Sequence, residues 1–171
     1  ICRRLDGIPL ALVLAAARLA AMSVQELAAS LDRRFDLLTT GPRSATERQR
    51  TLRAMIDWSH DMLAVDEQAA FADLAVFAGP ALLEDIAAVC RAGDGRSVET
   101  VLLSLFDKSL VVAVQDRSGQ TRYGFLETTR HYALERLDAD AARSARLRLA
   151  RRMLDVFARA EIDIETRSTV A

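Results

Sequence analysis

Lysine is almost absent from this sequence of 171 residues, since Lys108 is the only one and arginine supplies nearly all the positive charge. A Walker A phosphate loop needs a glycine directly before its lysine, but Phe106 and Asp107 precede Lys108. No glycine lies between Gly95 and Gly119. The chain therefore contains no P-loop, and we expect that it does not hydrolyse ATP by itself.

Cysteine and histidine are also scarce, with two of each. Cys2 and Cys90 have no ligand-spaced partners, and two lone thiols fit a reducing cytosol, so we expect a cytoplasmic location and buried or inert cysteines. The two histidines lie far apart, which leaves no zinc-spaced cluster and no evident Ser-His-Asp set. Long apolar runs are missing too, because Arg18 ends the apolar stretch 8–17 well short of the roughly 18 residues of a membrane span. We predict no catalytic residues, no metal site and no membrane contact.

Neither sign of charge dominates, because the net charge is −1. Such a balance gives no whole-domain attraction to nucleic acid or to an anionic membrane. With 51% hydrophobic and 27% charged residues, the chain can bury one sizeable core or two small ones. The chain begins at Ile1 without a signal-peptide pattern, and we expect it to be a fragment of a longer protein.

The step Gly7-Ile8-Pro9 predicts the start of a helix. Proline has a suitable φ and no N–H to lose at the first helical position, while a glycine lets the incoming backbone turn. The following residues are apolar around most of the helix, which is typical of a helix inside a bundle. A capping box, Ser23 with Glu26, predicts a second helix that begins at Val24.

A second set of patterns follows a polar segment that contains Gly41 and Pro42. Apolar residues recur at helical spacing, and Asp66 is the expected N-cap of one helix. The period then changes to that of two strands around a polar turn. The expected elements are helices at 52–63, 67–77, 83–90 and 98–106, strands at 110–114 and 121–125, and a helix from 127.

Several helices, a hairpin and a flanking helix describe a winged-helix domain. The predicted fold is mainly α: a helical bundle subdomain, a winged-helix domain with one β-hairpin, and the start of a further helical region. The domain limits that we predict are 1–40 for the helical subdomain, 41–50 for a linker, 51–137 for the winged helix and 138–171 for the start of the helical region.

The predicted helix at 98–106 is the candidate recognition helix of this winged helix. A helix that reads a DNA groove neutralises phosphates and presents Arg, Asn or Gln to the bases. This one has no arginine, carries Glu99, and is followed by Asp107 and Lys108. We therefore expect no direct contact of this chain with nucleic acid, and a DNA-binding winged helix remains the alternative.

The segment 141–160 contains six arginines against one aspartate. Leu147, Ala150, Leu154 and Phe157 recur at helical spacing and are expected to face a partner. The arginines allow two interpretations: a surface for nucleic acid or an acidic partner, or a solvated face whose arginines pair with acidic neighbours or a following repeat. We prefer the second.

Six ordered motifs resemble the back half of the ATPase module in bacterial STAND-type regulators, the large LuxR- and AfsR-like transcriptional regulators related to NB-ARC proteins. The resemblance covers roughly residues 1–137, whereas residues 141–171 resemble only the start of the helical, often tetratricopeptide-like, region that follows. They lie at residues 1–12, 31–38, 51–59, 74–79, 105–111 and 123–133.

The resemblance implies a nucleotide-responsive switch that couples ATP or ADP to effector domains. In such proteins an upstream P-loop domain holds the phosphates, and the Gly-x-Pro step packs against the adenine. Here that role falls on Gly7, Ile8 and Pro9, with Leu10 as lining. The implied partners are the upstream P-loop domain and downstream helical repeats of the same chain, with DNA bound through another domain, and we expect no tight nucleotide binding by this chain alone.

The resemblance also implies a phosphate sensor, a histidine in a Met-His-Asp-like triplet after the wing. Leu126 stands at the position of that histidine and cannot donate a hydrogen bond to phosphate. Arg130 and His131 are the candidate substitutes. A third interpretation is a helical scaffold whose nucleotide sensor has decayed.

Overall fold

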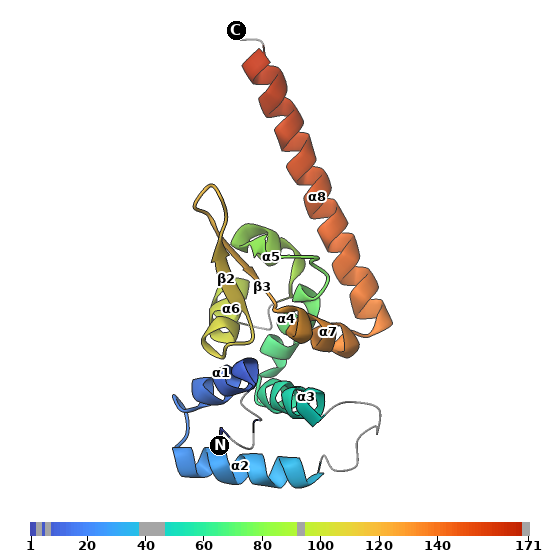
Figure 1. The fold of residues 1–171 in the computed structure, drawn as a ribbon. Helices are drawn as coiled ribbons and strands as arrows, with labels where there is room; N and C mark the ends of the chain where they lie inside the picture. Colours follow the sequence, from blue (N-terminus) through green and yellow to red (C-terminus); the bar gives the residue numbers. More distant parts are fainter. Residues whose placement is uncertain (3–4, 6–7, 38–46, 92–94, 169–171) are drawn as a thin grey trace.

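The structure, a computed structural model, describes residues 1–2, 5, 8–37, 47–91 and 95–168, with side-chain surroundings given for residues 1–2, 5, 8–31, 51–91 and 95–161. The fold is mostly helical, as predicted (Figure 1). Three helices, α1 (Pro9–Arg18), α2 (Val24–Leu37) and α3 (Glu47–Asp61), form one end of the molecule. A winged helix lies in the middle, and one long helix extends away from it.

Helix α1 begins as the sequence predicts, with Pro9 at its first position after an extended Ile8. The capping box of α2 is also confirmed. The backbone N–H of Ser23 donates to Glu26 Oε2 at 2.8 Å, and the N–H of Glu26 donates to Ser23 Oγ at 3.2 Å. Of the predicted linker, residues 47–50 belong to α3, and residues 41–46 lie outside the described residues.

The winged helix contains four helices and a small sheet. In the order β1-β3-β2, the sheet is antiparallel, with Val112 opposite Gly124 and Ala81 opposite Tyr123. The predicted hairpin is therefore present, and β1 is a third strand that a two-residue segment could not signal in the sequence. The elements are α4 (Val65–Leu74), β1 (Ala81–Leu82), α5 (Leu83–Val89), α6 (Val98–Asp107), β2 (Val112–Gln115), β3 (Thr121–Gly124) and α7 (Glu127–Arg136).

The start of α4 differs from the prediction. The N-cap residue is Ala64 and not Asp66, which lies in the first turn. Ala64 has no side-chain acceptor, so half of a capping box is made instead: its backbone N–H donates to Glu67 Oε2 at 2.9 Å. Asp66 helps in a different way, because its Oδ1 accepts from the N–H of Glu67.

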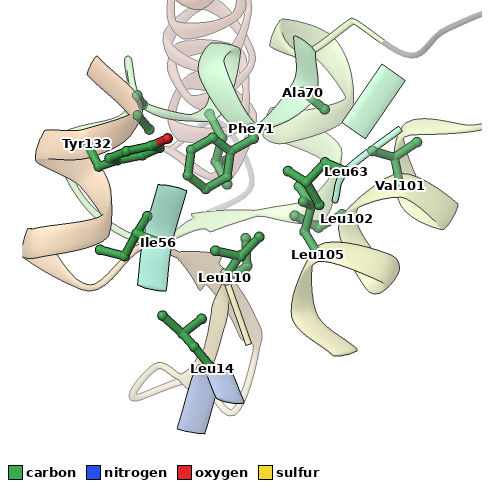
Figure 2. Close-up of a cluster of buried hydrophobic side chains, with 14 of the residues drawn as sticks. Leu14, Ile56, Leu63, Ala70, Phe71, Val101, Leu102, Leu105, Leu110 and Tyr132 are labelled. Atoms are coloured by element: carbon green, nitrogen blue, oxygen red, sulfur yellow. The ribbon is translucent and has the colours of Figure 1, made fainter. Parts of the chain in front are cut away.

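One continuous core joins the two regions. Phe71 of α4 is completely buried, with its ring centroid 4.9 Å from that of Phe125 and 6.2 Å from that of Tyr132. Leu14 of α1 is buried in the same cluster, close to Leu110 and Ile56 (Figure 2). Helix α1 is therefore held against the winged helix by apolar burial, which favours association without fixing direction.

The last helix, α8 (Ala139–Ser168), is attached along its first half and projects beyond the body (Figure 1). Arg148 donates to Asp73 Oδ2 at 2.9 Å, and Arg152 donates to Asp85 Oδ1 at 2.8 Å. Asp73 is fully buried and also accepts from Arg91 at 2.9 Å. These ion pairs bear out the preferred interpretation for two of the six arginines. In the described residues, no helix is both long and apolar enough to cross a membrane.

Candidate functional site: an apolar cleft between α1 and the winged helix

A cleft of about 800 Å³ separates the start of α1 from the winged helix. Pro9 and Leu10, which the resemblance singled out, lie on one side, and Leu126, at the position of the family's sensor histidine, lies on the other. The fold therefore brings together residues that are more than a hundred positions apart. The lining residues are Pro9, Leu10, Val13, Phe106, Asp107, Ser109, Val111, Val112, Ala113 and Leu126.

The walls of this cleft are apolar and accessible. Val13 is 50% exposed, Phe106 is 42% exposed and Leu126 is 45% exposed, although all three are large hydrophobic side chains. Among the described lining residues, Asp107 and Ser109 are polar and none is basic. A surface of this kind suits a flat, uncharged ring system better than a phosphate group, which needs cations or N–H donors.

The turn that carries Asp107 and Ser109 is held in place by an ion pair of the residue between them. Lys108 lies between them and donates to both carboxylate oxygens of Glu67, each at 2.6 Å. Glu67 also accepts from Ser104 Oγ at 2.6 Å. Ser109 has a φ of 59°, in the left-handed region that non-glycine residues seldom adopt. A buried ion pair thus holds a strained backbone at the edge of the cleft.

The ionisation of Glu67 reflects these contacts. Burial alone would raise the pKa of this carboxyl, but hydrogen bonds from Lys108, from Ser104 and from the N–H of Ala64 outweigh it and lower the pKa to about 2. Glu67 is therefore charged at neutral pH, and Lys108 is committed to it. The single lysine of the chain is a structural residue and is not free to meet an anion.

Of the other predicted site residues, the described ones, Ile8, Arg130 and His131, are not among the cleft lining. Gly7 is outside the described residues, and Ile8 is half-buried against the core. Arg130 Nε donates to the backbone oxygen of Phe77 at 3.0 Å. His131 is exposed on α7 and lies 3.1 Å from Glu127 Oε1. The structure does not bring these two cationic candidates to Pro9, and their role as phosphate sensors stays a prediction.

Sequence reasoning missed most of the winged-helix side of the cleft. The apolar character of Phe106 suggests that it shares the buried face of α6 with Leu105, but it lies one position beyond that residue and is exposed. One residue corresponds to 100° of rotation, so the helical spacing of Val101, Leu102 and Leu105 contained this signal. The position of Val13 was predictable for a similar reason. Helix α1 is apolar on most sides, so not all of its apolar side chains can face the core, and some must line another surface.

The possible DNA-contacting surface is poor in free positive charge. Helix α6 exposes Glu99, Leu103 and Asp107, and Lys108 is committed to Glu67. In the hairpin, Arg122 pairs with Asp116 at 2.8 Å. Arg117 is the basic side chain that has no ion-pair partner among the described residues of α6 and the hairpin.

Metal and thiol chemistry have little support in the described part of the chain. No group of three or more His, Cys, Asp or Glu residues there could hold a metal ion. Cys90 is buried, and burial raises the pKa of its thiol to about 12, so this cysteine is inert as expected. Cys2 is exposed, so burial does not account for the inertness expected of this thiol.

Comparison with known proteins adds two findings. The family model of the "Winged helix-turn-helix domain" matches residues 63–138, which span α4 to α7. A Mycobacterium tuberculosis protein named "Putative HTH-type transcriptional regulator" is 54% identical over 139 residues, which are 80% of this chain and 16% of that protein. The same identity and coverage are found for its Mycobacterium bovis counterpart. An "Uncharacterized protein" of Mycobacterium tuberculosis is 41% identical over 148 residues, 82% of this chain and 37% of that protein.

The chain thus contains a winged helix-turn-helix domain and is homologous to part of proteins named as transcriptional regulators. It spans only 16% of the length of those regulators. By themselves, the family match and the names favour direct DNA binding over nucleotide sensing. Two observations on the structure oppose this preference: the acidic character of α6 and the position of the apolar cleft.

Proposed function

We propose that this chain is a nucleotide-responsive regulatory module of a transcriptional regulator, in which the cleft between α1 and the winged helix takes the base of a purine nucleotide. The observation that carries the proposal is the meeting of Pro9 and Leu10 with Phe106 and Leu126 around one apolar cleft. A proline ring and apolar side chains make a suitable surface for a flat base. The resemblance to STAND-type regulators supports the same assignment.

The cleft also offers a reason why a ligand would have a regulatory effect. Its walls come from two parts of the fold, so a bound base contacts both only while α1 lies against the winged helix. A ligand shifts a conformational equilibrium by its differential affinity for the two states. Binding in the cleft would therefore stabilise the arrangement seen here, and its loss would allow α1 to move relative to the winged helix.

The residues present fit the base and not the phosphates. The described part of the lining has apolar walls and two polar side chains, Asp107 and Ser109, but no cation. Phosphate contacts would thus come from another part of the longer protein, as the resemblance implies. The chain alone is expected to bind a nucleoside weakly, with a dissociation constant of the order of 1 mM.

Saturation-transfer NMR with the chain tests this proposal, because it detects weak ligands. Adenosine and ADP should receive saturation at their base protons, whereas ribose 5-phosphate should not. Val13→Glu places a carboxylate in the cleft and should abolish the signal. Val24→Glu is the matched control, since Val24 is 53% exposed on α2 and does not line the cleft. Equal signals from the two variants would refute the cleft assignment.

Direct DNA binding is the second candidate function, favoured by the family match and the relatives' names. Titration of a labelled duplex at low salt tests it, because phosphate contacts weaken steeply as salt rises. We expect no binding, since Arg117 is the one basic side chain of α6 and the described hairpin without an ion-pair partner. Salt-dependent binding that Arg117→Glu removes would replace the nucleotide proposal with the DNA-binding one.

A further inference from the structure

Helix α8 presents large apolar side chains to solvent on the side that faces away from α5. Leu147 is 52% exposed, Leu154 is 69% exposed and Phe157 is 70% exposed. With Ala150 they follow the spacing i, i+3, i+7 and i+10, which places them on one face of the helix. The sequence predicted that this face meets a partner. Within the described structure it has none, because α8 contacts the body through the opposite face, where Ala145 is completely buried.

Unpaired arginines surround this apolar stripe. Arg143 precedes Leu147 by one turn, Arg151 follows it by one turn, and Arg146 precedes Ala150 by one turn. All three are exposed and take part in no ion pair among the described residues, in contrast to Arg148 and Arg152 on the body side. We call this surface the basic face of α8: Arg143, Arg146, Leu147, Ala150, Arg151, Leu154 and Phe157.

Helix α6 carries a surface of complementary character. Leu103 is 46% exposed and Phe106 is 42% exposed, and with Glu99 they follow i, i+4 and i+7. Asp107 lies beside Phe106. Neither Glu99 nor Asp107 has an ion-pair partner among the described residues. We call this the acidic face of α6: Glu99, Leu103, Phe106 and Asp107.

We infer that the basic face of α8 binds the acidic face of α6 in a second copy of this chain. The two faces combine apolar side chains of similar exposure with opposite, unpaired charges, which is the pattern that makes a helix–helix contact specific. The residues of the basic face are exposed along the attached half of α8, and the face continues through Leu154 and Phe157 to the half that projects beyond the body, so α6 of another copy can reach it (Figure 1). This use of α6 also accounts for the lack of arginine in a helix that occupies the recognition position.

The contact is head-to-tail, because each copy uses α8 toward one neighbour and α6 toward another. Such heterologous contacts let an assembly grow by addition of copies. Two helix faces bury less than the roughly 1,600 Å² of a standard interface, so the association is weak, with a dissociation constant of the order of 100 µM that rises with salt.

Sedimentation velocity of the whole chain over a range of concentrations tests the inference. The wild type should show a sedimentation coefficient that increases with concentration. Leu154→Glu on α8 and Leu103→Glu on α6 should each raise the dissociation constant at least about tenfold. Both positions are on the surface, and Leu103 does not line the cleft, so loss of nucleotide binding cannot explain its effect. Val24→Glu again serves as control and should associate like the wild type.

A mixture of the two variants separates head-to-tail contact from other modes. Each variant keeps one intact face, so an equimolar mixture should form a discrete dimer, although each variant alone is monomeric. Arg151→Glu is a second α8 variant that should also weaken the association. Circular dichroism checks that this exposed substitution leaves the fold intact. If Leu103→Glu associates like the wild type, α6 is not the docking surface. A wild type that stays monomeric up to about 1 mM, whether or not it binds anionic vesicles or duplex DNA, overturns the inference.

Discussion

Two clusters of buried polar side chains, one between α4 and α6 and one between α1 and α3, differ in how completely their hydrogen bonds are satisfied. Between α4 and α6, Glu67 receives Lys108 and Ser104 at 2.6 Å. Between α1 and α3, Arg18 is only 4% exposed, but its Nε has no hydrogen-bond partner in the described structure. The first cluster rigidifies the winged helix, whereas the second leaves the α1 junction without matching polar interactions.

The α1–α3 cluster includes two further atoms without hydrogen-bond partners in the described structure. Ser59 Oγ and His60 Nδ1 are buried and form no hydrogen bond with described groups, and Arg18 Nη2 reaches the backbone oxygen of Ser59 at the long distance of 3.4 Å. Burial lowers the pKa of Arg18, and the charge of Glu67 partly offsets this effect. A buried polar group without a partner costs free energy. The difference teaches that α1 is held mainly by apolar contacts, with one long hydrogen bond from Arg18, which is a suitable property for an element that moves when a ligand leaves the cleft.

The largest expected effect comes from breaking the satisfied cluster. Glu67→Gln keeps the shape of the side chain but leaves Lys108 without its charge partner, and we expect a loss of about 3 kcal/mol in the free energy of unfolding. Urea denaturation followed by circular dichroism measures it. Glu84→Gln is the control, since Glu84 pairs with Arg152 at 3.1 Å but is 67% exposed, and should cost less than about 1 kcal/mol. Equal losses in both variants would contradict the contrast.

A smaller effect of opposite sign is expected at the unsatisfied cluster. Arg18→Met keeps the length and apolar stem of the side chain and removes the buried charge. We expect the free energy of unfolding to stay constant or increase by about 1 kcal/mol. Arg18→Ala, which also leaves a cavity, should be destabilising by roughly 2 kcal/mol. A marked loss of stability in Arg18→Met would show that the guanidinium is well compensated and would remove the difference between the clusters.

The sequence was informative where the signal is local. A proline at the first helical position, the Ser23–Glu26 capping box and the change of period before the hairpin each depend on a few neighbouring residues. The N-cap of α4 was misplaced because Asp66 is a good capping residue in isolation, yet Glu67 satisfies the helix start from inside. Strand β1 was not predicted, because its two residues form a strand only through their pairing with β3.

The candidate site was less predictable, because its parts come from distant positions. Local patterns identify Pro9 as a helix start, but only the resemblance indicated that it belongs with the region after the wing. The partner of Lys108 lies 41 positions earlier, and nothing in the spacing of the sequence selects Glu67 among the many acidic residues. The buried face of α8 also differs from its apolar repeat at 147–157: it carries Ala145 and Leu149 together with the two arginines that pair with Asp73 and Asp85.

The smallest expected effect concerns His60 and the pH dependence of the unsatisfied cluster. Burial lowers the pKa of His60, and the nearby Arg136 lowers it further. The folded chain therefore binds a proton at this site less readily than the unfolded chain, whose histidine has a pKa of about 6.5. Stability contributed by neutral His60 is fully present above that pH and is lost as the pH falls toward the lowered pKa of the folded state.

His60→Phe tests this dependence, because the ring lies with its centroid 5.5 Å from that of Phe71 and 5.7 Å from that of Tyr132, and an aromatic replacement preserves those contacts. The wild type should lose stability between pH 7 and 5, and the variant should lose less, as followed by the fluorescence of the single tryptophan, Trp58. Glu67 does not interfere in this range, since its carboxyl titrates from about 4.5 in the unfolded chain to about 2 in the folded one. Parallel pH profiles for the two proteins would mean that protonation of His60 does not destabilise the folded chain. The polar groups of the α1–α3 cluster would then have partners that the hydrogen bonds in the structure do not show.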